Sequence, residues 1–382
     1  LTFSLRLEKT WKTGPYSVFY STHADYNGSF NTEKIDPDIN RHKEDSYKSR
    51  INRLSWINNI EWQSENQTAF FNSLSFNSSI SFSKDKVDEV RYNSLSRAMA
   101  APNSNEAGEH DGVFLPFQFV GTQKVDSRPF GAYVRLTGNF RLFIAKTRQE
   151  LKIGTDWQMD KNFGEGQLYD PLRPVNYTSI STRPRPYNDI PAGHDLSFFA
   201  EDYFTLPVST HTLEIQAGVR ASSLLNLPKA YKLHNKFYFD PRVNMKWLFP
   251  AFFIGDQKLS YEIGGGIGWH SMMPSLTQLY PNLLYEDIIQ LNYYHNNPAY
   301  RRLQMITYII DRTNPDLSAA RNFKWEIRGN ITYAENNLSV TYFKENMTSG
   351  FRTGTRLLPL AYKTYDNNSI DATTLDGPPD LS

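Results

Sequence analysis

The residues of this chain that could do chemistry are not grouped at catalytic or metal-binding spacings. The sequence has no cysteine, which excludes disulfides, thiolate metal sites and a cysteine nucleophile. No His-Glu-x-x-His pair or nucleophile elbow is present. We therefore expect neither an enzyme nor a resident metal or cofactor. We expect the eight histidines to be scattered polar residues: His23, His42, His110, His194, His211, His234, His270 and His295.

Two short motifs have the outline of ligand sites but lack essential residues. The glycine-rich segment 264–268 has no Lys-Ser/Thr ending and no strand–turn–helix setting, so it predicts a strand that another backbone approaches closely rather than a nucleotide loop. The segment 36–40 has spaced oxygen ligands, but Arg41 and Tyr47 stand where an EF-hand needs Gly and Glu. That segment predicts an Asp-Pro turn, with a loop calcium site as the alternative.

A third group combines aromatic rings and guanidinium groups within residues 280–310. Tyrosine offers a large contact area with a polar tip, and arginine can hold a carboxylate or phosphate through two hydrogen bonds. The alternative is that these side chains pack against one another within the loop. The candidate ligand-binding residues are Tyr285, Tyr293, Tyr294, Tyr300, Arg301 and Arg302.

The elements that must position these groups are long strands with one apolar and one polar face. In the segment 132–144, Val134 and Leu136 alternate with Arg135 and Thr137. Because successive strand side chains point to opposite faces, each such segment has one apolar and one charged wall. Turned toward lipid, an Arg or Lys near mid-membrane would cost ~2–4 kcal/mol, so in a membrane barrel the charged wall faces the wet lumen. The candidate lumen-facing residues are Arg135, Arg141, Glu150, Lys152, Glu214, Arg220, Glu326 and Arg328.

About twelve alternating segments of this kind occur along the chain. Most are near the ~9–11 residues that cross a bilayer at a tilt, and short connections alternate with long ones, as in outer-membrane barrels. The pattern predicts an all-β fold, an antiparallel transmembrane β-barrel of the outer-membrane type, with about twelve strands present. The expected strands are 1–10, 15–26, 48–62, 69–84, 130–145, 147–161, 195–206, 211–222, 236–249, 257–270, 321–334 and 336–347.

Composition agrees with a barrel and excludes other classes. Aromatic residues make up 14%, although the mean hydropathy is only −0.56, and no apolar run approaches the length of a membrane-spanning helix. The net charge of +1 gives no global field to attract nucleic acid. The alternative at this point is a large soluble β-protein whose apolar face is turned inward.

Several motifs in series resemble those of TonB-dependent outer-membrane receptors, over roughly residues 195–350. The order and spacing match as well as the residues. The quoted motifs are Leu196-Ser197-Phe198-Phe199-Ala200-Glu201-Asp202-Tyr203-Phe204, Leu213-Glu214-Ile215-Gln216-Ala217-Gly218-Val219-Arg220, Asp240-Pro241-Arg242-Val243, Pro274-Ser275-Leu276-Thr277-Gln278-Leu279, Asn314-Pro315-Asp316-Leu317 and Lys324-Trp325-Glu326-Ile327-Arg328-Gly329.

The resemblance implies an active transporter of the Gram-negative outer membrane. Its partners would be outer-membrane lipid, the TonB complex acting through a plug domain, a surface lipoprotein and a scarce nutrient such as an iron chelate, an oligosaccharide or a peptide. Family barrels have 22 strands, so residues 1–382 would be a partial barrel without the plug and the remaining strands. The long, aromatic-rich loops are similar to those of Bacteroidetes receptors. Two alternatives are a passive outer-membrane channel and a soluble β-rich adhesion protein.

Overall fold

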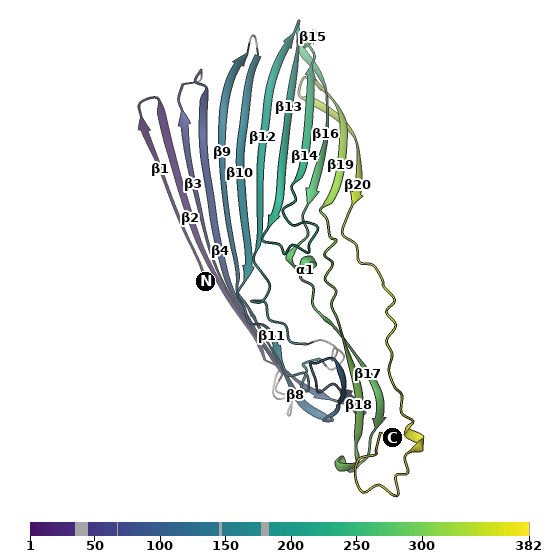
Figure 1. The fold of residues 1–382 in the computed structure, drawn as a ribbon. Coiled ribbons are helices and arrows are strands. Elements are labelled where there is room, and N and C mark those ends of the chain that lie inside the picture. Colours follow the sequence, from purple (N-terminus) through teal and green to yellow (C-terminus); the bar gives the residue numbers. More distant parts are fainter. Residues whose placement is uncertain (35–44, 67, 145–146, 177–182, 382) are drawn as a thin grey trace.

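The protein is a long antiparallel sheet that stands as one wall, with a body of loops at one of its ends (Figure 1). The computed structural model describes residues 1–34, 45–66, 68–144, 147–176 and 183–381. Twelve strands follow one another along the wall, each paired antiparallel with the next: β1 (Thr2–Thr13), β2 (Tyr16–Lys34), β3 (Ser46–Ser64), β4 (Phe71–Ser94), β9 (Pro129–Ile144), β10 (Thr147–Asn162), β12 (Gly193–Val208), β13 (His211–Leu225), β14 (Tyr238–Leu248), β16 (Gln257–Met272), β19 (Ala320–Tyr333) and β20 (Asn336–Ser349).

The twelve expected strands are confirmed, and most of their ends fall within a few residues of the prediction. The largest differences are in β2, which runs to Lys34 rather than to residue 26, and in β4, which runs to Ser94 rather than to residue 84. Both strands continue past the predicted ends because β2, β3 and β4 stay in unbroken register with one another. Backbone pairing therefore extends the strands where the alternating pattern no longer marks them.

Short and long connections alternate along the wall as expected. We call the end with the short connections the turn end, and the other end the loop end. The long connections 85–129 and 271–320 also contain strands, because long segments that leave the wall can pair with one another. They contain β5 (Met99–Ala101), β6 (Gly108–Asp111), β7 (Val113–Leu115), β8 (Gln118–Ser127), β17 (Leu284–Tyr293) and β18 (Arg302–Ile310).

These additional strands form a loop body beyond the loop end of the wall (Figure 1). β17 and β18 make a hairpin, and β6 pairs with the free side of β18. β5 pairs with β7, while β8 extends along β4 and also pairs with β11 (Gly166–Tyr169). A further short strand, β15 (Phe252–Ile254), pairs with β16 at the turn end.

The register determines which side chains share a face of the wall. From β9 to β19 the pairings contain no bulge, so a face followed from strand to strand never changes sides. Arg141 opposes Glu150, Lys152 opposes Glu201, and the ladder continues to the last strands. All eight charged residues expected on the wet wall lie on this one side, which we call the polar face: Arg135, Arg141, Glu150, Lys152, Glu214, Arg220, Glu326 and Arg328.

On the opposite side of the wall, which we call the apolar face, many large hydrophobic side chains are exposed. Ile153, Ile263 and Ile327 are each about half exposed, at 47%, 52% and 55%. Rows rich in aromatic residues cross this face near both ends: Trp11, Val18, Trp62 and Leu74 toward the turn end, and Tyr26, Leu54, Phe82 and Phe130 toward the loop end. Between Trp62 and Leu54 the strand covers about 26 Å.

A small hydrophobic core holds the loop body to the wall. The short helix α1 (Leu276–Leu279) delivers Leu279, which is 1% exposed. Its start is capped because the Ser275 backbone N–H donates to Gln278 Oε1 at 2.8 Å. The Pro-Ser-x-x-Gln-Leu motif is therefore a capped turn that buries a leucine. The core consists of Leu224, Leu227, Tyr231, Leu233, Tyr238, Leu279 and Ala319.

The Asn-Pro-x-Leu motif joins the same core from the other side. The Asn314 side chain accepts a hydrogen bond from the Asp316 backbone N–H at 3.0 Å, which closes an Asx turn. This turn places Leu317 against the core, and the carbonyl of Pro315 accepts from the Lys232 backbone N–H at 2.8 Å. Among the described residues, no helix has the length and apolarity that a membrane crossing needs.

The first prediction concerns a glycine on the polar face. A Cβ at Gly154 would lie 2.5 Å from the carbonyl oxygen of Leu136 and would also meet the ring of Phe199. We expect Gly154→Leu to destabilise the folded barrel by ~1–3 kcal/mol through overpacking. Urea unfolding of the intact protein in lipid vesicles would measure the change.

Gly329→Leu is the matched control, because nothing lies within 4 Å of its Cβ position and Gly329 is on the apolar face, opposite Ile263. An equal loss of stability in the two variants would contradict the assignment of Gly154 to a packed face.

Candidate functional site

The polar face carries ion pairs between its strands. Arg220 on β13 donates to Asp156 on β10 at 2.8 Å, reaching across β12. Lys246 on β14 lies 3.0 Å from Glu262 on β16. Lys324 on β19 lies 3.2 Å from Glu345 on β20. These contacts use the charges within the wall itself, and each is at least partly open to solvent.

Glu201 is the centre of the largest cluster on this face. It accepts from the Arg242 guanidinium and from Gln216 Nε2 at 2.9 Å, and Lys152 Nζ lies 4.0 Å away. Glu201 lies in the family-like motif 196–204 but is not among the predicted lumen-facing residues. Strand alternation could have placed Glu201 on the polar face, because Phe199, Glu201 and Tyr203 are two residues apart and share one face of β12.

The other predicted polar-face residues have different surroundings. Arg135 lies over the ring of Phe199, 4.7 Å from its centroid. Arg141 is largely buried and donates to Asn72 Oδ1 at 3.1 Å. Glu326 and Arg328 form no ion pair with any residue that the structure describes. They therefore stand open toward the space in front of β19.

Some charged residues break the separation of faces, and two of them lie on β12 and β20. Asp202 lies opposite Leu151 and Ala217 on the apolar face, and Lys344 lies on the same face opposite Trp325. Within the described part of the chain, Asp202 Oδ1 is buried without a hydrogen-bond partner. The adjacent Glu201 needs the polar face, and strand alternation then forces Asp202 to the other side.

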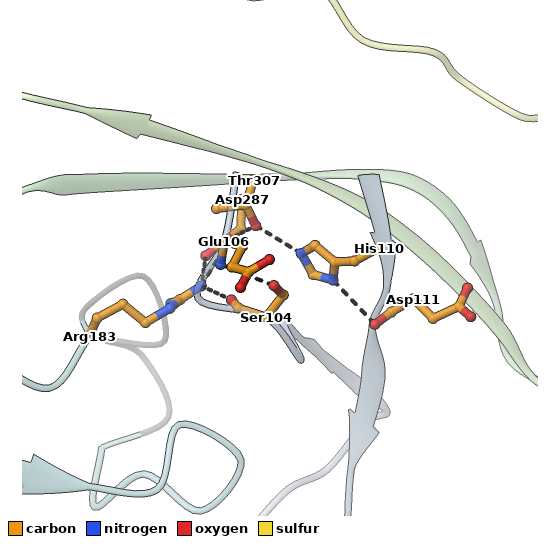
Figure 2. Close-up of polar contacts among 7 residues, drawn as sticks. All are labelled: Ser104, Glu106, His110, Asp111, Arg183, Asp287 and Thr307. Atoms are coloured by element: carbon orange, nitrogen blue, oxygen red, sulfur yellow. Dashed lines mark hydrogen bonds and ion pairs between the residues drawn. The ribbon is translucent and has the colours of Figure 1, made fainter. Parts of the chain in front are cut away.

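A buried ion pair joins distant segments of the loop body, as Figure 2 shows. Arg183 Nη2 donates to both carboxylate oxygens of Asp287 on β17, at 3.0 and 3.1 Å, and the two side chains are only 4% and 8% exposed. The guanidinium also lies over the ring of Tyr285, 4.9 Å from its centroid. A buried charge pair of this geometry fixes the position of the segment that carries Arg183 relative to the hairpin.

The contact continues from Asp287 through two more side chains to β6 (Figure 2). The Thr307 hydroxyl donates to Asp287 Oδ1 at 2.6 Å, and His110 Nε2 lies 2.8 Å from Thr307 Oγ1. Because the hydroxyl gives its own hydrogen to the carboxylate, its oxygen accepts from an Nε2–H of His110. We call Arg183, Asp287, Thr307 and His110 the loop junction. These four residues are far apart in the sequence, so the sequence pattern could not predict that they meet.

The candidate ligand-binding residues divide between two places. Tyr293, Tyr294, Tyr300 and Arg301 gather at the tip of the hairpin around His295, which lies 6.3 Å from the Tyr293 ring and 5.3 Å from the Tyr300 ring. Tyr285 instead lies at the loop junction. Arg302 lies on β18, 3.3 Å from Asp111.

Arg301 is fully engaged at the hairpin tip. Its Nε donates to the His295 carbonyl at 2.8 Å, its Nη2 donates to the Tyr294 hydroxyl at 3.0 Å, and the guanidinium lies 4.3 Å from the Tyr294 ring centroid. These contacts favour the alternative in which Arg301 holds the tip together. The rings of Tyr293, Tyr294 and Tyr300 remain half-buried.

The segment after β20 folds back against the hairpin. The Tyr365 backbone N–H donates to the Gln290 carbonyl at 2.9 Å, and Lys363 Nζ lies 3.3 Å from Glu109 on β6. Glu109 also accepts from Gln290 Nε2 at 3.1 Å. The hydrogen bonds from Gln290 and then Lys363 lower the pKa of Glu109 below its ordinary value of 4.5.

Two hollows at the loop end are large enough for a small ligand. One of about 610 Å³ borders the polar face, and its lining includes Asp25, Ser81, Asp160 and Leu276. The other, of about 1180 Å³, lies between β18 and the segment after β20 and is lined in part by Arg312, Arg352 and Arg356. The described residues contain no group of three acidic or histidine side chains that could hold a metal ion. The segment 36–40 lies outside those residues.

Comparisons with known proteins support the fold. No protein-family model and no curated protein matches the sequence. Among solved structures, the RagAB peptide transporter matches with a TM-score of 0.53 at 11% identity, over 90% of this chain and 40% of that chain. This chain therefore spans well under half the length of that relative. The TonB-dependent receptor-like fold that the motifs predicted is confirmed.

Two siderophore receptors are also similar in structure. PirA from Acinetobacter baumannii matches at 13% identity, over 96% of this chain and 55% of that chain, with a TM-score of 0.40. The ferric enterobactin receptor PfeA from Pseudomonas aeruginosa matches at 14% identity, over 96% and 56%, also with a TM-score of 0.40. These scores are too low to support an argument, and the identities are too low to transfer a ligand.

The second prediction tests the loop junction. Asp287→Asn removes the charge that compensates buried Arg183, so we expect the opening free energy of β17 and β18 to fall by ~3–5 kcal/mol. Hydrogen exchange of the hairpin amides in the intact protein would report it. Asp111→Asn is the control, because the Asp111 side chain is 67% exposed and its pair with Arg302 should contribute only ~0–1 kcal/mol. Similar protection in both variants would show that the junction does not hold the hairpin.

The third prediction concerns acid. Because the pKa of Glu109 is lowered in the folded protein, the stability it contributes is present above pH 4.5 and is lost as the pH falls through the folded value. We expect hydrogen-exchange protection of residues 363–367 to fall on acidification below pH 4.5. Glu109→Gln should lower protection at neutral pH and remove its part of the pH dependence. An unchanged acid profile in that variant would contradict the assignment.

Proposed function

We propose that this chain forms part of the barrel wall of an outer-membrane active transporter, which takes up a scarce nutrient with energy supplied through TonB. The apolar face contacts lipid, and the polar face lines the lumen. The observation that carries the proposal is the register, which collects the eight predicted charges on one face and leaves large hydrophobic side chains exposed on the other.

The two aromatic-rich rows support the membrane placement. Aromatic girdles mark the two interfaces of outer-membrane barrels, around an apolar band ~25 Å tall. Trp62 lies in the row toward the turn end, which we call the lower row. Leu54 lies in the row toward the loop end, which we call the upper aromatic-rich row. The two residues are about 26 Å apart along β3. In this orientation the turn end faces the periplasm and the loop body faces the cell exterior.

The proposal includes further strands and a plug outside residues 1–382. The outer sides of β1 and β20 pair with no strand among the described residues. Hydrocarbon offers no water to satisfy such an edge, so an open wall is not a stable membrane structure. A plug would contact the open charges Glu326 and Arg328 and would link the lumen to TonB.

The nutrient would first contact the loop body. We assign this contact to the half-buried rings of Tyr293, Tyr294 and Tyr300 and to Tyr285 and Arg302, with Arg301 holding the tip in shape. An iron chelate, an oligosaccharide or a peptide remains the candidate cargo. A surface lipoprotein that covers the loop body is the proposed protein partner.

The fourth prediction tests the membrane placement. The sequence has no cysteine, so single cysteines report one position each. In the intact protein reconstituted in vesicles, Ile153→Cys and Ile327→Cys should react with a bilayer-restricted photoprobe, whereas Lys152→Cys and Arg328→Cys should not. Labelling of the second pair instead of the first would overturn the assignment of the faces.

Transport itself requires a separate measurement. Cells that carry the full-length protein should accumulate the nutrient only with an intact TonB system and an energised inner membrane. Accumulation that persists without energy would indicate a passive channel. A monodisperse product in water without detergent would indicate a soluble β-protein.

A further inference from the structure

A small cationic groove lies at the loop end of β3 and β4, on the outside of the wall. It has a volume of about 160 Å³ and is lined by Arg50, Asn52, Lys84 and Lys86. No carboxylate contributes to its lining. We call these four residues the outer groove.

The register places the outer groove on the apolar face and not in the lumen. Arg50 opposes Lys86 and Asn52 opposes Lys84, while the next pair on the same face is Leu54 with Phe82. Leu54 and Phe82 are 52% and 40% exposed and belong to the upper aromatic-rich row. The three cations are therefore outward-facing side chains, directly beyond the aromatic-rich row at the loop end.

The charges of the outer groove are not compensated within the described residues. Like charges directly opposite each other in a sheet are destabilising, and Arg50 and Lys86 are such a pair. None of the three cations is in an ion pair with a described residue, and the Arg50 guanidinium lies over the ring of Phe30, 5.7 Å from its centroid. The carboxylate of Asp126 opposes Lys86 on its other side, but Arg128 Nε binds it at 3.0 Å.

Asn52 completes a set of hydrogen-bond donors. Its Oδ1 accepts from the Tyr26 hydroxyl at 2.9 Å, which leaves the amide NH₂ as the polar group that the side chain offers to the groove. Arg, Lys and amide N–H groups together match the oxygens of a phosphate. A groove lined by donors alone, with two like charges in direct opposition, is complementary to a bound anion.

The depth of the outer groove identifies the source of the anion. Rows on one face of a strand are two residues, about 7 Å, apart along the strand. The row of Asn52 and Lys84 and the row of Arg50 and Lys86 are thus the first two above the upper aromatic-rich row. If the proposed membrane placement is correct, this is the level of the lipid headgroups. We propose that the outer groove binds the phosphate of an anionic lipid in the leaflet that faces the cell exterior.

The fifth prediction uses a fluorophore on Leu54→Cys as the one cysteine within residues 1–382 of the intact protein. Brominated phosphatidylglycerol should quench it at lower mole fraction than brominated phosphatidylcholine. Replacing Arg50, Lys84 and Lys86 together by Gln should weaken this preference by about a hundredfold, because each cation near an anionic surface contributes roughly fivefold. Arg53→Gln is the matched control: it removes a cation from the polar face of the same strand and should leave the preference unchanged.

The outcomes separate this inference from the proposed function. No quenching by either lipid would refute the membrane placement itself. Equal quenching by both lipids, or a preference that survives the triple substitution, would refute the outer groove alone. Binding of inorganic phosphate to the detergent-solubilised protein without any lipid preference would also overturn the proposal, because the anion would then come from solution.

The stability of the single variant Lys86→Gln distinguishes a binding role from a structural one. In neutral detergent, removal of one of two opposed cations should leave the unfolding midpoint unchanged or raise it. A lowered unfolding midpoint, together with an equal loss of quenching by both brominated lipids, would assign Lys86 to the fold and would refute the proposal.

Discussion

Collecting most charges of the wall on one side is the constraint on which the structure depends. A slip of one residue in any strand pairing would turn its charged set toward the apolar face. The cost would be ~2–4 kcal/mol for each Arg or Lys near mid-membrane, whereas an exposed pair such as Lys324 with Glu345 contributes only ~0–1 kcal/mol. Sidedness therefore selects the register, and the ion pairs follow from it.

The loop body is held by different interactions, because its segments do not share one uninterrupted ladder with the wall. A core around Leu279 anchors it, and the buried pair of Arg183 and Asp287 joins segments more than a hundred residues apart. A buried pair is costly to break, so it specifies one arrangement of the loops even where its net contribution to stability is small. The tyrosine-rich tip can then present its rings from a defined position.

The family-like motifs in this chain serve mainly as structural devices. Ser275 and Gln278 cap the turn that buries Leu279, Asn314 closes the turn that places Leu317 on the same core, and Glu201 collects donors from neighbouring strands. None of these contacts identifies the transported ligand. Specificity in this wall therefore depends on the loop body and on whatever the polar face surrounds.

The order of residues was sufficient to predict the twelve wall strands, their sidedness and the alternation of turns and loops, because period-two patterning is a local property. It did not reveal the extensions of β2 and β4 or the hairpin of β17 and β18, which exist because distant segments pair. The loop junction of Arg183, Asp287, Thr307 and His110 and the opposition of Arg50 to Lys86 also depended on register between strands. Contacts of this kind join residues far apart in the chain, so only the tertiary structure decides them.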